Sequence, residues 1–276
     1  GAVSNIILDY VFMYPLNLGI MGAALATALG PVFSVVILLQ HFIRKKGSLM
    51  FEKTRLRIKT LGQIARLGFP AFIMEFSIGI ITLVYNLAIV LKGYGEIGLA
   101  AYLVIGYLML MILTVFLGLA EGLQPVFSAF SSLGMQDKIH SLRQFSLKVF
   151  LVLGGLSLAF VLFMSEGFFT LFSPNDPELV AFSVARSLPY FIGFTFSGIN
   201  ILYIVYWQSL HQVGKALWVS LARSLLLPPL LVVALPLFFG REGIWFALSV
   251  AEMLTAGLVV SLYCQNEKST PELAHV

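Results

Sequence analysis

The sequence predicts an all-α polytopic membrane protein, and composition and pattern both support this. Hydrophobic residues make up 59% of the chain and charged residues only 11%, whereas soluble domains carry roughly 25% charged residues. A soluble protein of 276 residues could not keep so much apolar surface away from water. Apolar stretches of ~20 residues, the length that crosses a ~30 Å hydrocarbon core, recur along the whole chain.

The order of these stretches predicts the helices. The end of one helix comes first, at 5–14, and the turn sequence at 15–19 closes it. Seven complete spans are expected after it, at 20–43, 67–91, 97–133, 149–165, 187–210, 225–239 and 243–264. A straight helix over 97–133 would be ~55 Å long, so this span should either bend near Pro125 or extend beyond the bilayer.

The basic residues predict how the chain is oriented. Segment 44–60 holds seven Lys or Arg residues, and every second loop after it is again the more basic one. Because cytoplasmic loops are enriched in Lys and Arg, these loops and the C-terminus are expected in the cytoplasm, with the chain crossing the cell (inner) membrane several times. We therefore expect four parts: the end of an N-terminal helix bundle (1–43), a basic cytoplasmic linker (44–60), a six-helix transmembrane bundle (61–264) and a cytoplasmic tail (265–276).

Other classes of protein fit poorly. The net charge of +4 does not indicate nucleic-acid binding, because the basic residues lie in loops between apolar runs. Cys264 is the only cysteine, so neither an intrachain disulfide nor a cysteine-based metal site is expected. The G-x-G-x-x-G pattern at 93–98 follows a lipid-length helix rather than a strand, and it predicts a tight turn.

An enzyme is also not expected, and neither is a cofactor. His41, His140 and His211 lie in different segments without a known catalytic or metal-ligand spacing. The chain begins Gly1-Ala2-Val3, without an initiator Met or a signal sequence, so it is expected to be part of a larger protein.

Acidic residues inside predicted spans are the main functional candidates, because a charge at the centre of a bilayer costs ~2.5–3.5 kcal/mol. Glu75 lies nine residues after Arg66, ~13 Å into its span. Gly79, Thr82 and Asn86 follow it at +4, +7 and +11, so the four residues share one helical face. This face predicts a cation or substrate site; the alternative is a packed glutamate paired with an arginine, Arg186 or Arg223.

Further polar and aromatic residues extend the list of candidates for cation or substrate binding. Asp9 and Glu252 are the other acids placed well inside predicted spans, although no polar stripe accompanies Glu252. Asn200 lies on a polar face of the 187–210 span, with Tyr203 and Trp207 beside it. Aromatic faces attract cations, so such a lining suits flat or cationic small organic molecules.

Three short motifs resemble those of a known family. They are R-L-G-F-P at 66–70, which opens a span after the basic segment, G-L-A-E-G-L-Q-P at 118–125, and G-A-A-L-A-T at 22–27. In order and spacing they resemble MATE (multidrug and toxic compound extrusion) transporters, and with F-P-A-F-I-M-E at 69–75 they are most like the bacterial DinF/MepA-like branch.

This resemblance implies a fold of twelve helices in two six-helix bundles, which exports drugs or metabolites in exchange for H⁺ or Na⁺. The chain would then hold the last two helices of the first bundle and the whole second bundle, without roughly the first four helices, which would be its partners. Glu75 would fall in the helix where many family members carry a coupling glutamate. Two alternatives remain: a lipid-linked oligosaccharide flippase of the same superfamily, and a membrane assembly protein that does not transport.

Overall fold

The structure, a computed structural model, describes residues 2–44 and 57–269. These residues are almost entirely helical and include no strand, which confirms the predicted all-α membrane fold. The chain divides into two compact units, Gly1–Ile58 and Lys59–Val276, and each is described by itself below. Most of the expected basic linker and the end of the expected tail, 45–56 and 270–276, lie outside the described residues.

The first unit is a helical hairpin of α1 (Ala2–Met13) and α2 (Gly19–Ile43). Its turn contains two residues with positive φ, Asn17 (50°) and Gly19 (51°), which end one helix and allow the next to begin. The helices approach closely at Gly22, where an added Cβ would lie 2.9 Å from the backbone carbon of Phe12. The predicted break at 15–19 is therefore confirmed.

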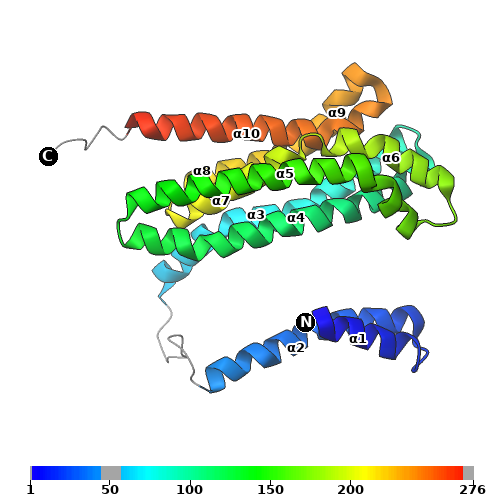
Figure 1. Ribbon diagram of the computed structural model, residues 1–276, viewed down its shortest axis with the longest axis horizontal. Helices are drawn as coiled ribbons and strands as arrows, with labels where there is room; N and C mark the ends of the chain where they lie inside the picture. Colours follow the sequence, from blue (N-terminus) through cyan, green and yellow to red (C-terminus); the bar gives the residue numbers. More distant parts are fainter. Residues whose placement is uncertain (1, 45–56, 270–276) are drawn as a thin grey trace. The chain divides into compact units, whose positions relative to one another are not determined.

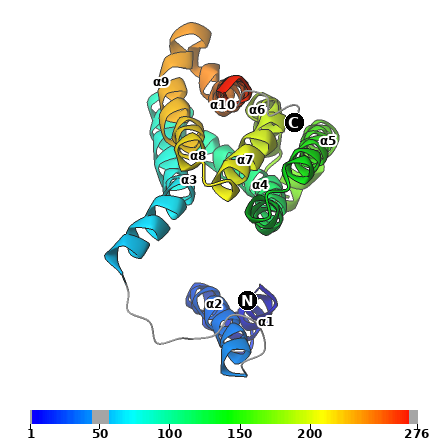
Figure 2. The same ribbon diagram turned by 90° about the vertical axis from the view of Figure 1, so that its left-hand side faces the viewer.

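The second unit contains the remaining helices. They are α3 (Ile58–Leu91), α4 (Gly95–Ser132), α5 (Gln136–Phe172), α6 (Pro177–Phe191), α7 (Phe194–Ser209), α8 (Val213–Ser220), the π-helical turn η1 (Leu221–Leu226), α9 (Leu227–Phe239), the 3₁₀ turn η2 (Gly240–Glu242) and α10 (Gly243–Ser269). The long helices of this unit run side by side (Figure 1), and an end-on view shows them as a bundle (Figure 2). Helix α7 packs against α4, α5 and α10 and occupies the centre of the bundle.

Among the described residues, five helical segments are long and apolar enough to cross a membrane, or six if α6 and α7, which meet at 47°, form one span. The last of them, 213–265, would be ~80 Å long if it were straight. It is instead divided at η2, where Gly240 has a φ of 62°, and α10 packs back against α9. With that turn counted, every predicted span has a helical counterpart.

Several predicted spans are shorter than the helices that contain them. The span expected at 149–165 belongs to α5, which is 37 residues long. The span expected at 187–210 begins ten residues earlier with α6, because Asp176 caps the helix by accepting a hydrogen bond from the Leu179 amide (2.9 Å) and Pro177 fits its first turn. Helix α4 continues through Pro125 without interruption, so its great length does not require a break there.

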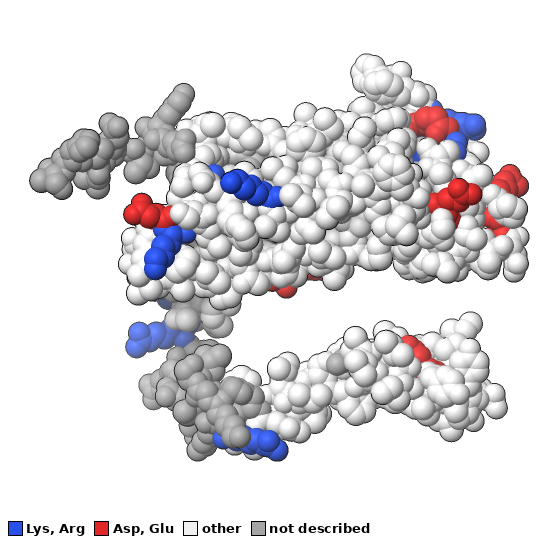
Figure 3. Space-filling model, in the orientation of Figure 1, with Lys and Arg blue, Asp and Glu red and all other residues white. Residues whose placement is uncertain are grey.

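The distribution of charge fits a lipid-facing bundle. On the face of the second unit seen in Figure 3, charged atoms gather mainly toward the two ends and the long middle is mostly uncharged. The G-x-G-x-x-G segment forms the predicted turn between α3 and α4, with φ of 75° at Gly93 and 63° at Gly95.

Candidate functional site

A cavity of about 70 Å³ lies inside the second unit, between α3, α4, α7, η1 and α10. This volume has room for several water molecules, since one water needs only about 10–15 Å³ of such space. Most of the wall is apolar, but three lining residues belong to the charged residue types: Glu75, Arg223 and Glu252. The other lining residues are Ser77, Ile78, Ile81, Thr82, Tyr102, Met109, Leu113, Leu117, Phe194, Ser224 and Leu248.

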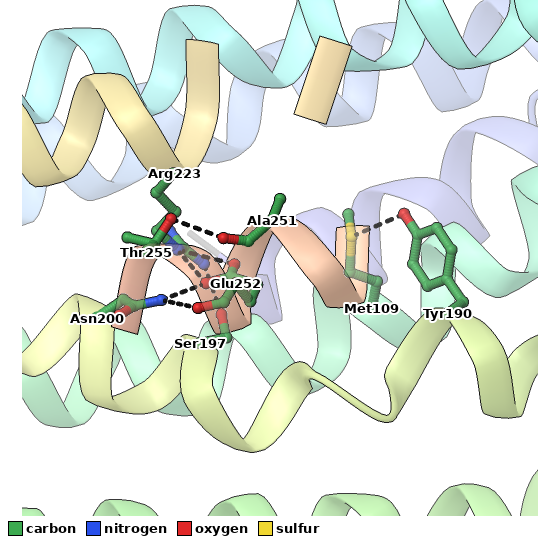
Figure 4. A network of polar contacts seen from close by, with 8 residues as sticks. All are labelled: Met109, Tyr190, Ser197, Asn200, Arg223, Ala251, Glu252 and Thr255. Carbon is green, nitrogen blue, oxygen red and sulfur yellow. Dashed lines mark hydrogen bonds and ion pairs between the residues drawn. The ribbon is translucent and has the colours of Figure 1, made fainter. Parts of the chain in front are cut away.

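Arg223 and Glu252 form a buried ion pair on the wall of this cavity (Figure 4). Arg223 Nε lies 2.9 Å from Glu252 Oε1, and the two residues are only 8% and 2% exposed. The Asn200 side-chain amide donates to Oε2 of Glu252 (2.7 Å), and Arg223 Nη2 donates to the Ser197 hydroxyl (2.6 Å). The pair thus joins η1, α7 and α10, and both charges have close partners, as buried charges require.

Local sequence accounts for the position of Arg223. It lies in the middle of η1, a single π-helical turn between α8 and α9. Pro228 and Pro229 follow and lack the amide hydrogens that would bond the carbonyls of Ser224 and Leu225 in a regular α-helix. π-Helical turns of this kind occur frequently at functional sites.

Glu75 lines the same cavity but differs from Glu252 in its surroundings. Its side chain is exposed in the second unit and makes no ion pair with any residue that the structure describes. The two arginines considered as its partners are paired with other carboxylates: Arg223 binds Glu252, and Arg186 binds Glu242 (3.0 Å). Of the two carboxylates on the cavity wall, Glu75 is therefore the one without a counter-ion in the described chain.

A second, more open cavity of about 450 Å³ adjoins the first between α3 and α4. The two share Ile78, Thr82, Tyr102 and Met109, and the second adds Asn86. The predicted stripe therefore runs along both cavities: Glu75 lines the inner one, Asn86 lines the adjoining one, and Thr82 lines both. An aromatic and thioether wall of this type can adapt to flat apolar molecules.

Stacked tyrosines hold α3 against the rest of the bundle beside this cavity. The rings of Tyr85 and Tyr102 are parallel with centroids 4.9 Å apart, and Tyr190 from α6 meets Tyr85 edge-on at 5.9 Å. The Tyr190 hydroxyl also donates to the sulfur of Met109 (3.4 Å). Nothing in the sequence indicated this contact between Tyr190 and Met109, which are 81 residues apart.

Two predicted candidates lie away from the cavity. Tyr203 and Trp207 belong to a separate apolar cluster with Val219 and Val259. The Tyr203 hydroxyl accepts a hydrogen bond from Arg143 (2.9 Å), and Trp207 is fully buried. Asn200 comes from the same helix but faces α10, where it binds Glu252.

Asp9 lies in the first unit and is half-buried. Its Oδ1 atom is buried without a hydrogen-bond partner in the described chain, and so is the Nδ2 atom of Asn5, one helical turn earlier. Among the described residues no group of three or more His, Cys, Asp or Glu could hold a metal ion.

The comparisons with known proteins agree on one fold. No protein-family profile matches the chain. The multidrug export protein MepA of Staphylococcus saprophyticus is 26% identical over 279 residues, which is 100% of this chain and 61% of MepA, and that of Staphylococcus haemolyticus is 28% identical over 258 residues, 93% and 56%. Among solved structures, an outward-facing multidrug resistance MATE family transporter of the MOP superfamily matches with a TM-score of 0.87 (18% identity; 98% of this chain, 61% of that one).

The chain has the fold of MATE transporters. A second solved structure, MATE in complex with MaL6, gives a TM-score of 0.86 at 19% identity and covers 97% of this chain and 61% of that one. The resemblance to MATE transporters of the MepA type, inferred from the motifs, is thereby confirmed over the whole chain. The chain spans only about 60% of the length of the MepA and MATE proteins that it matches.

This MATE-like bundle brings together some of the predicted residues and separates others. Glu75, Thr82 and Glu252 line the inner cavity, and Asn86 lines the adjoining one. Asn200 donates a hydrogen bond to the carboxylate of Glu252. Tyr203 and Trp207 are not part of this constellation. Asp9 belongs to the first unit. From the sequence, Arg223 was considered only as a partner for Glu75. The structure places it on the cavity wall, bound to Glu252.

Proposed function

We propose that the chain is part of a secondary transporter that exports small organic cations in exchange for H⁺ or Na⁺. The observation that carries this proposal is the Glu75 carboxylate, which lies on a cavity wall within an apolar bundle and has no counter-ion among the described residues. Ionisable groups kept at such positions usually serve an ion or substrate pathway. The relatives named multidrug export proteins support the same reading.

Exchange follows from competition for one negative charge. A carboxylate without a built-in partner can bind a proton, a sodium ion or an organic cation, but an apolar surrounding disfavours leaving it empty and charged. In the outward-open state the coupling ion binds from outside and displaces the cationic substrate to that same side. In the inward-open state the substrate displaces the ion, so alternation between the two access states exports the substrate. Asn86 and Thr82 supply neutral polar contacts along the same path.

The adjoining cavity supports a flat or bulky organic substrate. Its wall combines the rings of Tyr102 and Tyr107 with the thioether of Met109. Tyrosine faces attract cations, and methionine repacks around varied shapes. We place the protein in the cell membrane with its C-terminus in the cytoplasm, in accordance with the distribution of Lys and Arg.

A flippase for lipid-linked oligosaccharides is the main alternative within the same superfamily. A diphosphate-bearing substrate would favour an excess of basic residues in the cavity. Here the described lining has two carboxylates and one guanidinium, and that guanidinium is already bound to Glu252. The charge therefore favours a cationic substrate.

The test is ethidium efflux from vesicles that hold the full-length protein, with the Na⁺ and pH gradients collapsed separately. The Glu75→Gln variant should insert normally but lose efflux coupled to either gradient. Glu178→Gln, an exposed glutamate at the start of α6, is the matched control and should keep it. Unchanged efflux in Glu75→Gln would remove the basis of the proposal.

A further inference from the structure

The lining of the inner cavity contains more negative than positive side chains. Two carboxylates and one guanidinium line it, so the described lining sums to one negative charge. Glu252 is already neutralised by Arg223 at 2.9 Å, and Asn200 holds the carboxylate from the other side. The remaining negative charge is that of Glu75.

Two contacts fix the position of the Arg223 guanidinium. Its Nε faces Glu252, and its Nη2 donates to Ser197 at 2.6 Å, so the guanidinium connects α10 with α7 (Figure 4). Glu252 and Arg223 are almost fully buried, whereas Glu75 is exposed. An incoming cation therefore meets Glu75 as a free partner, and it meets Glu252 only as the bound partner of Arg223.

We propose that Arg223 is a built-in counter-cation that restricts this cavity to substrates with a single positive charge. The inference rests on the proposed export of cations and adds the charge that the substrate carries. One positive group of a ligand neutralises Glu75. A second positive group in the cavity would find no free carboxylate and would be repelled by the guanidinium of Arg223, which lines the same wall.

The size of the two cavities allows a matched pair of probes. The inner cavity of about 70 Å³ is too small for a polycyclic dye, but the adjoining one of about 450 Å³ can take its aromatic body. Ethidium and propidium share the same phenanthridinium ring system and differ mainly in a side chain that adds a second permanent charge to propidium. Both report binding through their own fluorescence.

The experiment measures equilibrium binding of ethidium and of propidium to the full-length protein. The wild type should prefer ethidium by roughly tenfold, as expected for one like charge at short range in a partly solvated site. Arg223→Gln should bring this ratio close to one, because Glu252 then becomes available. The double variant Arg223→Gln/Glu252→Gln should restore the preference for ethidium, because the net charge of the lining returns to its original value.

A second variant avoids the buried network, in case Arg223→Gln does not fold. Thr82 is an exposed residue on both cavity walls, so Thr82→Glu adds a free carboxylate without breaking the ion pair. It should raise propidium binding relative to ethidium. Equal binding of both dyes by the wild type, or an unchanged ratio in Thr82→Glu, would overturn the role of Arg223 while leaving cation export standing. Binding of neither dye would overturn the proposed function as well.

Discussion

Arg223 Nε lies 2.9 Å from a carboxylate oxygen of Glu252, and this contact joins the π-helical turn between α8 and α9 to the last helix. Both residues are almost fully buried, and each has a further hydrogen bond to α7. The pair therefore connects three helices at the wall of the cavity. Its charges also cancel each other, which leaves Glu75 as the unbalanced charge.

Breaking this pair from one side should destabilise the protein strongly. Glu252→Gln leaves the Arg223 charge buried without its partner, a situation that costs about 3–5 kcal/mol. Thermal unfolding of the purified full-length protein should show a lower midpoint. The double variant Arg223→Met/Glu252→Leu, which buries no charge, should lose much less. Equal losses in the single and double variants would mean that the ionic contact itself contributes little.

Close packing between α5 and α7 depends on Gly154. A Cβ at this position would lie 2.7 Å from the Thr195 Cα, a contact with backbone that cannot move aside easily. Gly154→Ala should therefore lower the unfolding midpoint, with a cost of about 1–3 kcal/mol for overpacking.

Its neighbour provides the control for this substitution. A Cβ on Gly155 would meet nothing within 4 Å, so Gly155→Ala should be neutral or slightly stabilising. A result in which both alanine variants behave alike would contradict the packing assigned to α5 and α7.

Tyr94, in the turn between α3 and α4, should make stability depend on high pH. Burial raises the pKa of its phenol above the usual value near 10. Because the folded pKa lies above the unfolded one, the stabilising contribution is full below pH 10 and is lost as pH rises through the folded pKa. Unfolding midpoints at pH 9 and pH 11 should therefore differ less in Tyr94→Phe than in the wild type. An identical loss in both would show that this hydroxyl does not titrate with folding.

Asp9 provides a separate prediction for the first unit. Its Oδ1 atom is buried and has no partner in the described chain, and one helical turn earlier the Asn5 amide nitrogen is also unpartnered. If Glu75 alone carries the coupling ion, Asp9→Asn should keep gradient-driven ethidium efflux in the full-length protein. Loss of efflux in Asp9→Asn, with Glu75→Gln still active, would move the coupling site to the first unit.

Much of the fold could be predicted because membrane helices leave a strong local signal. A run of ~20 apolar residues marks a span regardless of its neighbours. The ends of helices were less predictable. The span predicted at 187–210 leaves out residues 177–186, which include Glu178 and Arg186. In the structure the helix extends through this segment, because Asp176 caps it and Arg186 is compensated by Glu242.

The candidate site could be predicted only where its residues lie on one helix. Glu75, Thr82 and Asn86 share a helical face, and the structure places all three along a connected cavity lining. The pairing of Arg223 with Glu252 joins residues 29 positions apart through a π-helical turn, for which the sequence pattern gives no register. Helix α7 is buried on nearly all sides, so helical spacing alone could not tell which of its polar residues face the cavity.

Export by this mechanism requires that water and a cation can reach the carboxylate position of Glu75 inside the bundle. This access is tested most directly by the rate at which a small cationic, membrane-impermeant methanethiosulfonate modifies Glu75→Cys in the full-length protein, in a background from which the accessible cysteines, Cys264 among them, have been removed. The comparison is Phe163→Cys, whose position on α5 is 84% exposed and expected to face lipid. We predict rapid modification of the Glu75→Cys thiol that ethidium slows, and little modification of Phe163→Cys. A Glu75→Cys thiol as unreactive as that of Phe163→Cys, or one that ethidium does not protect, would contradict the proposed export mechanism.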